Sequence, residues 1–205
     1  LVNTVALQYT WRLGPQTTAL VQSRFYPDLP FTSRRPAEHI SLDGTPLPEL
    51  AHRQLVVANG NTDGALIGVA VERVMTLLKG GTLTNAEGTR HLTDADVAVV
   101  VPHVPQAAAV RAMLAGHPGV LVGTADALQG LERPAVVAVH PLAGKRIADE
   151  FSLKPGRLCV MLSRHRSHLS LLIDDQTDAV LCAAETEGID EARTVLADML
   201  ATDKF

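Results

Sequence analysis

The sequence lacks any run of 18 or more apolar residues, has only two cysteines and is poor in aromatic side chains. Without a long apolar run, no membrane-spanning helix is expected. Cys159 and Cys182 cannot build a disulfide framework, which is typical of proteins in a reducing cytoplasm. No basic start followed by an apolar block indicates a signal peptide. We therefore expect a cytoplasmic protein that does not contact a membrane.

The sequence also lacks the pattern GxxxxGK[ST], which cradles nucleotide phosphates in many enzymes. The segment Ala143-Gly144-Lys145 does not supply it, because the upstream glycine and the Ser or Thr after the lysine are missing. Neither Asp149-Glu150 nor Asp174-Asp175 is an acidic pair beside such a cradle. We expect from these absences that the chain cannot bind and hydrolyse ATP alone.

The net charge of −4 is mild for a domain that would bind nucleic acid through its phosphates alone. Contacts with nucleic acid should therefore be local or shared with another domain. His165 and His168 are three apart, but no further ligand cluster accompanies them, so no metal site is expected. Because the chain begins at Leu1 rather than Met, we expect it to be a fragment of a longer protein.

Short, β-branched apolar runs predict buried parallel strands at residues 96–101, 120–122 and 135–139. Further strands are predicted at 3–9, 54–58 and 168–173, a turn at 59–61, and a hairpin or loop at 82–92. Helices are predicted at residues 16–24, 64–79, up to 114, 157–165 (beginning near 155), and from 189. A chain of 205 residues has room for one good-sized core or two small ones. We predict one α/β domain, a largely parallel sheet with helices on both faces.

Polar residues gather between two of the apolar runs, at Thr124, Asp126, Gln129, Gly130 and Glu132. They would emerge at a sheet edge, where α/β proteins commonly place ligands. An ordinary solvated loop between two strands is an equally good explanation of this stretch alone. Two further stretches favour a ligand site. They are RLCVMLSRHRSHLSLLID at residues 157–174 and LQYTWRLGP at residues 7–15.

Together these three stretches resemble the motifs of superfamily 1 helicases, in their second, C-terminal RecA-like domain. The pattern Thr-x-Asp-x-x-Gln-Gly-x-Glu is present in full at residues 124–132. The resemblance covers most of the chain, and it implies a three-layer RecA-like fold. It departs from the family in having Trp11 where Tyr is more common and His165 where the family usually has Ala.

The resemblance implies contacts with ATP from three motifs. Trp11 would stack on the adenine and Arg12 would reach the γ-phosphate, as a π face and a guanidinium fork allow. Arg164, in Ser163-Arg164, would act as an arginine finger on the transferring phosphoryl group. The alternative for Arg164 is an ordinary basic helix end. A lone Trp is by default a core residue, which is the alternative for Trp11.

Within the second motif, the resemblance implies that Gly130 lets the backbone approach a phosphate and that Glu132 accepts hydrogen bonds from the ribose hydroxyls. Gln129 would couple the two ligand sites, and Thr124 would face the nucleic-acid backbone. His103 and Gln106 stand in a Pro-x-x-x-Gln step after a central strand, beside the expected nucleic-acid track. His103 could equally be an exposed loop residue, and Gln106 could equally cap a helix.

The function implied is that of the second motor domain of an ATP-dependent helicase or translocase. ATP with Mg²⁺ would lie between this domain and a missing N-terminal domain that carries the P-loop and holds the Mg²⁺. The expected partners are that N-terminal RecA-like domain and single-stranded nucleic acid, DNA in preference to RNA, held mainly by its backbone. The alternative is a binding module for nucleic acid or protein that keeps the fold without the motor.

Overall fold

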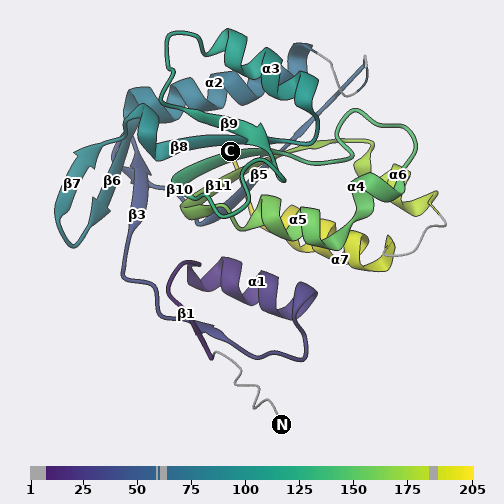
Figure 1. The fold of residues 1–205 in the computed structure, drawn as a ribbon, viewed down its shortest axis with the longest axis horizontal. Helices are drawn as coiled ribbons and strands as arrows, with labels where there is room; N and C mark the ends of the chain where they lie inside the picture. Colours follow the sequence, from purple (N-terminus) through teal and green to yellow (C-terminus); the bar gives the residue numbers. More distant parts are fainter. Residues whose placement is uncertain (1–7, 59, 61–63, 185–188) are drawn as a thin grey trace.

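A central sheet of six parallel strands, in the order β12-β5-β11-β10-β8-β9, runs through the computed structural model (Figure 1). The structure describes residues 8–58, 60, 64–184 and 189–205. The strands of this sheet are β5 (Leu50–Leu55), β8 (Val97–Val101), β9 (Leu121–Thr124), β10 (Arg133–Val139), β11 (His165–Asp174) and β12 (Asp203–Lys204).

The middle strands are buried on both faces, which explains their continuous apolar sequence. Every residue of β8 is buried, as is β10 from its second residue onward. Arg133 at the start of β10 pairs with His165 at the start of β11, and Thr124 at the end of β9 pairs with Val101 at the end of β8. We call the end of the sheet at which β10 and β11 begin the amino edge. We call the opposite end, at which β8 and β9 finish, the carboxyl edge.

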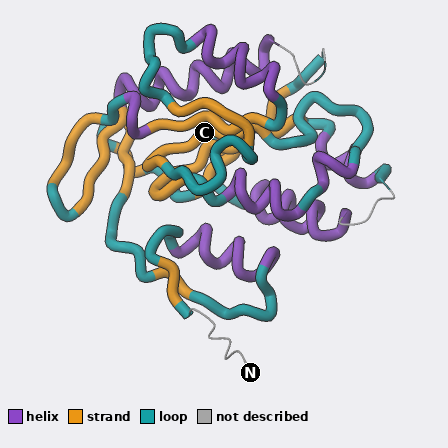
Figure 2. Tube along the Cα trace, viewed as in Figure 1, coloured by secondary structure: helices purple, strands orange, loops and turns teal. Residues whose placement is uncertain are grey.

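Helices cover both faces of the sheet (Figures 1 and 2). The helices α2 (Gly64–Gly80) and α3 (Val104–Met113) pack into one apolar cluster with the sheet. A second cluster on the other face takes its residues from α1 (Pro15–Phe25), α5 (Pro155–Leu162), α6 (Thr177–Cys182) and α7 (Ile189–Leu200). The predicted three-layer α/β architecture is confirmed, and it is consistent with a RecA-like domain.

Two small sheets and two short helical turns complete the described structure. The pair β1 (Tyr9–Thr10) and β2 (Thr32–Ser33) lies beside α1, and a four-stranded antiparallel sheet projects from the side of the domain (Figure 1). The antiparallel strands are β3 (His39–Leu42), β4 (Thr45–Pro46), β6 (Gly81–Asn85) and β7 (Gly88–His91). The short turns are the 3₁₀ turn η1 (Asp94–Asp96) and α4 (Glu150–Leu153), which precedes α5.

Several predicted boundaries were wrong. The strand expected at 54–58 is β5, which begins at Leu50, and the helix expected to reach His165 ends at Leu162. The strand expected at 168–173 is β11, which begins at His165 and contains buried polar residues that are hydrogen-bonded: His168 Nδ1 lies 2.7 Å from the carbonyl oxygen of Pro48. Most of the strand expected at 3–9, and most of the turn at 59–61, lie outside the described residues.

Candidate functional site

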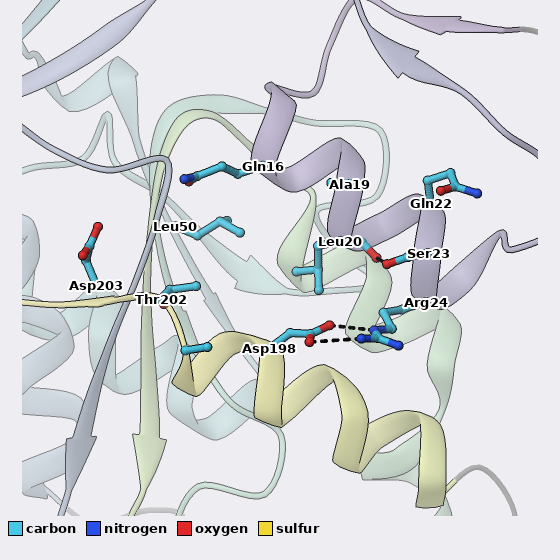
Figure 3. A pocket seen from close by; sticks show the side chains of 11 residues that line it. Gln16, Ala19, Leu20, Gln22, Ser23, Arg24, Leu50, Asp198, Thr202 and Asp203 are labelled. Atoms are coloured by element: carbon cyan, nitrogen blue, oxygen red, sulfur yellow. Dashed lines mark hydrogen bonds and ion pairs between the residues drawn. The ribbon is translucent and has the colours of Figure 1, made fainter.

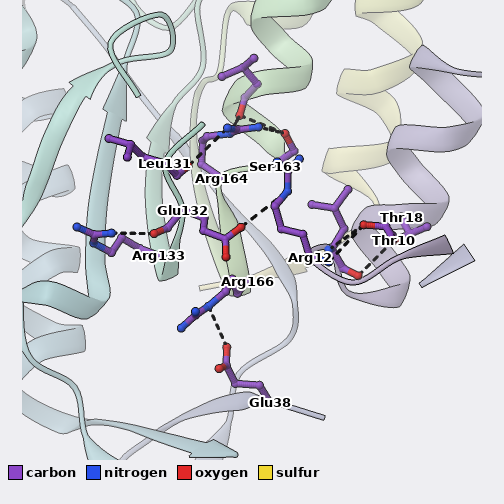
Figure 4. A network of polar contacts seen from close by, with 12 residues as sticks. Thr10, Arg12, Thr18, Glu38, Leu131, Glu132, Arg133, Ser163, Arg164 and Arg166 are labelled. Atoms are coloured by element: carbon purple, nitrogen blue, oxygen red, sulfur yellow. Dashed lines mark hydrogen bonds and ion pairs between the residues drawn. The ribbon is translucent and has the colours of Figure 1, made fainter. Parts of the chain in front are cut away.

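Residues from three distant stretches meet at the amino edge (Figure 4). Arg12 Nε lies 3.9 Å from Glu132 Oε2, and the guanidinium of Arg164 contacts the backbone of the residue before Glu132. Trp11 is 67% exposed and lines a cavity of about 310 Å³ together with Glu132. Four of the residues predicted from separate motifs are therefore brought together in space.

Local structure fixes the direction of the Trp11–Arg12 segment. Thr10 Oγ1 accepts a hydrogen bond from the Arg12 amide, and Pro15 occupies the first turn of α1, where its missing N–H costs nothing. The carboxylate of Glu49 caps α1 by accepting from the amides of Gln16 and Thr17. The segment that carries Arg12 is thus held from both sides.

A buried contact ties that segment to the strand that follows Arg164. Thr17 Oγ1 lies 2.7 Å from His165 Nε2, and its hydroxyl also hydrogen-bonds to the carboxylate of Glu49. His165 is fully buried, and burial together with nearby positive charges lowers its pKa to about 3. It is therefore a neutral hydrogen-bonding residue at neutral pH.

Arg164 is buried, at 6% exposure, and its side chain is hydrogen-bonded to other residues of this domain. Its guanidinium donates hydrogen bonds to Val160 O (3.1 Å), Ser163 Oγ (3.0 Å) and Leu131 O (3.5 Å). The backbone carbonyl of Arg164 accepts a hydrogen bond from the backbone amide of Arg133 at 3.1 Å. Burial and, after it, the charge of Arg12 lower the pKa of Arg164. In this structure Arg164 holds the residues on both sides of Glu132 in place.

Gly130 has a φ of +84°, in the left-handed region that favours glycine. A Cβ at this position would meet no atom of the described residues within 4 Å, so the backbone here is open to a ligand. Gln129 is exposed next to it, and its amide donates to the carbonyl of Asp126. The glycine is thus required by conformation and leaves an accessible backbone.

The three residues predicted to bind nucleic acid lie at the carboxyl edge instead. Thr124 ends β9, and its hydroxyl accepts from the Ala127 amide at 3.3 Å. His103 precedes α3, and its amide donates to Gln106 Oε1 at 3.1 Å. Because Gln106 is 1% exposed, the structure gives it the helix-capping role that its sequence had left open. It positions His103 rather than reaching outward.

The structure pairs His103 with an aromatic residue that sequence reasoning missed. The rings of His103 and Phe151 are stacked, with centroids 5.6 Å apart and planes 16° from parallel. Burial lowers the pKa of His103, so the ring is neutral at neutral pH. Phe151, on α4, is 40% exposed. The scarcity of aromatic residues in the chain is the one signal that could have drawn attention to it.

The predicted site residues therefore divide between opposite edges of the sheet. The segment 125–132 begins beside Thr124 at the carboxyl edge and ends beside Arg133 at the amino edge. The expectation that its polar residues emerge together at one edge was wrong, because this short connection crosses the sheet without a helix. The proposed coupling role of Gln129 remains a prediction.

Other charged residues that line the cavity were also missed, Arg166 and Glu38 among them. Arg166, on β11, lines it together with Glu38, and Arg166 Nε lies 3.6 Å from Glu38 Oε1. Glu38 is also paired with Arg35 at 3.3 Å. The signal for Arg166 was its place two residues after Arg164 in a basic stretch.

A larger hollow of about 710 Å³ lies between α1 and α7 (Figure 3). Its wall includes the ion pair of Arg24 with Asp198, at 2.6 Å, and it contains none of the predicted site residues. Among the described residues, no cluster of His, Cys, Asp and Glu could hold a metal ion. No helix in the described part of the chain is long and apolar enough to cross a membrane.

Comparisons with known proteins found similarity among solved structures. No protein-family model matches the chain, and no curated protein matches it. Among solved structures, the C-terminal domain of a possible DNA helicase from Lactobacillus plantarum WCFS1 is similar, with a TM-score of 0.47 and 15% sequence identity. The match covers 80% of this chain and 88% of that one. A likeness at this level says nothing about function.

Proposed function

We propose that this chain is the second motor domain of an ATP-dependent superfamily 1 helicase or translocase. One observation carries the proposal: Trp11, Arg12, Glu132 and Arg164, from three motifs far apart in sequence, meet at one edge of the sheet. A domain without a nucleotide site has no folding requirement for an exposed Trp beside this set of charges. The domain would supply half of a site whose other half, with the P-loop, belongs to an N-terminal RecA-like domain.

Charge and exposure at the amino edge suit a phosphate. The guanidinium groups of Arg12, Arg164 and Arg166 gather there, and the charge of Arg12 contributes to lowering the pKa of Arg164. Glu132 and Glu38 partly offset this positive charge, so a phosphate would take the place of a carboxylate beside these guanidinium groups. The Arg12–Glu132 pair is 3.9 Å long and partly exposed, so it contributes at most about 1 kcal/mol. Both side chains can therefore exchange this contact for one with a ligand.

The remaining contacts follow from shape. The exposed face of Trp11 is a stacking surface for the purine, and Glu132, which lines the same cavity, is an acceptor for ribose hydroxyls. Gly130 offers open backbone to a phosphate. The Mg²⁺ that accompanies ATP would be held by the N-terminal domain, since the described residues contain no acidic cluster for it.

Before Arg164 can contact a phosphate, its side chain must break the hydrogen bonds that it makes within this domain. Its hydrogen bonds to Val160, Ser163 and Leu131 hold the Glu132 segment in place. To serve as an arginine finger, it must leave those partners as the two domains close around ATP. Closure of the cleft would then be a condition for hydrolysis.

Single-stranded nucleic acid, DNA in preference to RNA, would lie along the carboxyl edge. His103 offers a neutral ring beside Phe151, and Thr124 stands at the end of the neighbouring strand β9. Rings at a strand-binding surface stack on bases without reading their sequence. The domain would track the strand mainly by its backbone.

The test uses the full-length parent protein and compares Arg12→Ala with Arg34→Ala. Arg34 is an exposed arginine whose guanidinium lies over the Tyr9 ring, so it matches Arg12 in charge and neighbourhood. We expect strand-stimulated ATP hydrolysis in the wild type and in Arg34→Ala, and its loss in Arg12→Ala. A parent that hydrolyses no ATP would instead favour a binding module that keeps the fold without the motor.

A further inference from the structure

We propose that Arg157 is a positioning residue that couples the carboxyl edge to the amino edge. It would transmit the binding of single-stranded nucleic acid at the carboxyl edge to the residues that face the nucleotide. This inference rests on the proposed function, because it concerns how the two ligands of that function influence each other. Arg157 itself touches neither ligand.

At the carboxyl edge, Arg157 forms the end of a column of side chains. Its guanidinium lies 3.6 Å from the centre of the Phe151 ring, whose other neighbour is the stacked ring of His103. The same guanidinium pairs with Asp126, with Nη2 3.0 Å from Oδ2. Because the Arg157 side chain is only 13% exposed, it is held by these neighbours rather than free in solvent. A nucleic-acid strand that displaces His103 or Phe151 on binding must therefore displace Arg157 as well.

From Arg157, two segments of chain run side by side to the amino edge. One is α5, which begins at Pro155 and leads into Arg164, and the other is the segment 125–132. They are tied at the carboxyl edge by Arg157 and Asp126, and at the amino edge by Arg164 bonding to Leu131 and Arg133 (Figure 4). Between the ties, their apolar residues belong to one buried cluster: Leu128, Leu158, Met161 and Leu162.

This arrangement can carry a displacement between the two edges. An eight-residue helix is about 12 Å long and does not shorten, so a shift at its first turn reaches Ser163 and Arg164. The segment 125–132 contains no helix or strand that could carry such a shift. Its end at Glu132 would instead move with α5, because the contacts at both edges join the two segments. The Arg157–Asp126 pair is the tie nearest the strand-binding surface. Without it, strand binding would leave Arg12, Glu132 and Arg164 unchanged.

The experiment measures how strongly single-stranded DNA stimulates ATP hydrolysis by the full-length parent. The variants are Arg157→Gln and Asp126→Asn, and the matched control is Arg24→Gln. The control breaks the ion pair with Asp198, which joins α1 to α7 and does not connect the two edges. We expect stimulation to fall about fivefold or more in both test variants, within the usual range of coupling between sites. Basal hydrolysis, the Kd for the strand and the stimulation of Arg24→Gln should stay at wild-type values.

Arg157→Lys should keep most of the stimulation, because a lysine keeps a cation beside both Phe151 and Asp126. If Arg157→Gln does not fold, Asp126→Asn decides, since its side chain is 69% exposed and its loss leaves the core intact. Wild-type stimulation in a folded Asp126→Asn, or an equal loss in Arg24→Gln, would overturn the coupling role alone. A wild-type parent that no strand stimulates would overturn this inference and the proposed function together.

Discussion

Three buried histidines predict that mild acid destabilises this chain. Burial lowers the pKa of His140 to about 4, and it is the largest cause of lowering the pKa of His168 to about 4 and that of His165 to about 3. The ordinary value is 6.5. The folded chain therefore keeps these three rings neutral down to about pH 4, whereas the unfolded chain protonates them near pH 6.5.

The direction and size of the effect follow from that difference. Above pH 6.5 neither state binds the extra protons, so this contribution to stability is complete. As the pH falls below 6.5, the unfolded state takes up protons that the folded state cannot, and stability decreases until the pH reaches the folded pKa values. At pH 5, each histidine costs about 2 kcal/mol and the three together about 6 kcal/mol. That is comparable with the whole stability of many domains.

Chemical unfolding of the chain, followed by circular dichroism from pH 8 to pH 5, measures this directly. His140→Asn is the informative variant. In the wild type, His140 Nδ1 accepts a hydrogen bond from the Leu142 amide at 3.2 Å, and the side-chain oxygen of an Asn can still accept it. We expect the pH dependence of His140→Asn to be weaker near pH 5 by about 1.4 kcal/mol per pH unit. A free energy of unfolding that does not change between pH 7.5 and 5, or a variant with the wild-type pH dependence, would refute the reasoning.

Three further substitutions test single residues. Arg164→Ala should lower the free energy of unfolding by about 2 kcal/mol, or about 4–8 °C in melting temperature, because a charged hydrogen-bonded group is lost; an unchanged melt would show that these bonds do not hold the Glu132 segment. Trp11→Ala should change stability by less than about 0.5 kcal/mol, since the ring is 67% exposed, while weakening ATP binding by the parent in an equilibrium titration. Gly130→Ala should cost about 1 kcal/mol in urea unfolding, through its φ of +84° alone, and no cost would contradict the left-handed backbone.

The apolar pattern was sufficient for the central layers of the fold. The run at 96–101 became β8, and the helix predicted at 64–79 is α2 almost to the residue. The pattern was insufficient where buried residues are polar. In β11, Ser170 is fully buried because its hydroxyl accepts from Arg73 Nε at 2.9 Å, and no periodicity of hydrophobic residues reveals such a partner.

For the candidate site, motif spacing indicated which residues to examine but not how they are arranged. The proximity of Arg12 to Glu132 followed from the resemblance, yet the burial of Arg164 depends on two carbonyl groups, those of Val160 and Leu131, which two different segments place around it. The stacking of His103 on Phe151 likewise depends on where α4 lies. Contacts of this kind are set by packing between elements, and they are visible only in the folded chain.

The most direct test of the central claim is ATP hydrolysis by the full-length parent, measured with and without single-stranded DNA or RNA, in the wild type and in Arg164→Ala. Nucleotide binding is measured in parallel on the same proteins. The proposed function predicts that the strand stimulates hydrolysis, and that Arg164→Ala abolishes hydrolysis while nucleotide binding survives. Hydrolysis at the wild-type rate in a folded Arg164→Ala, or a parent that no strand stimulates, would contradict it.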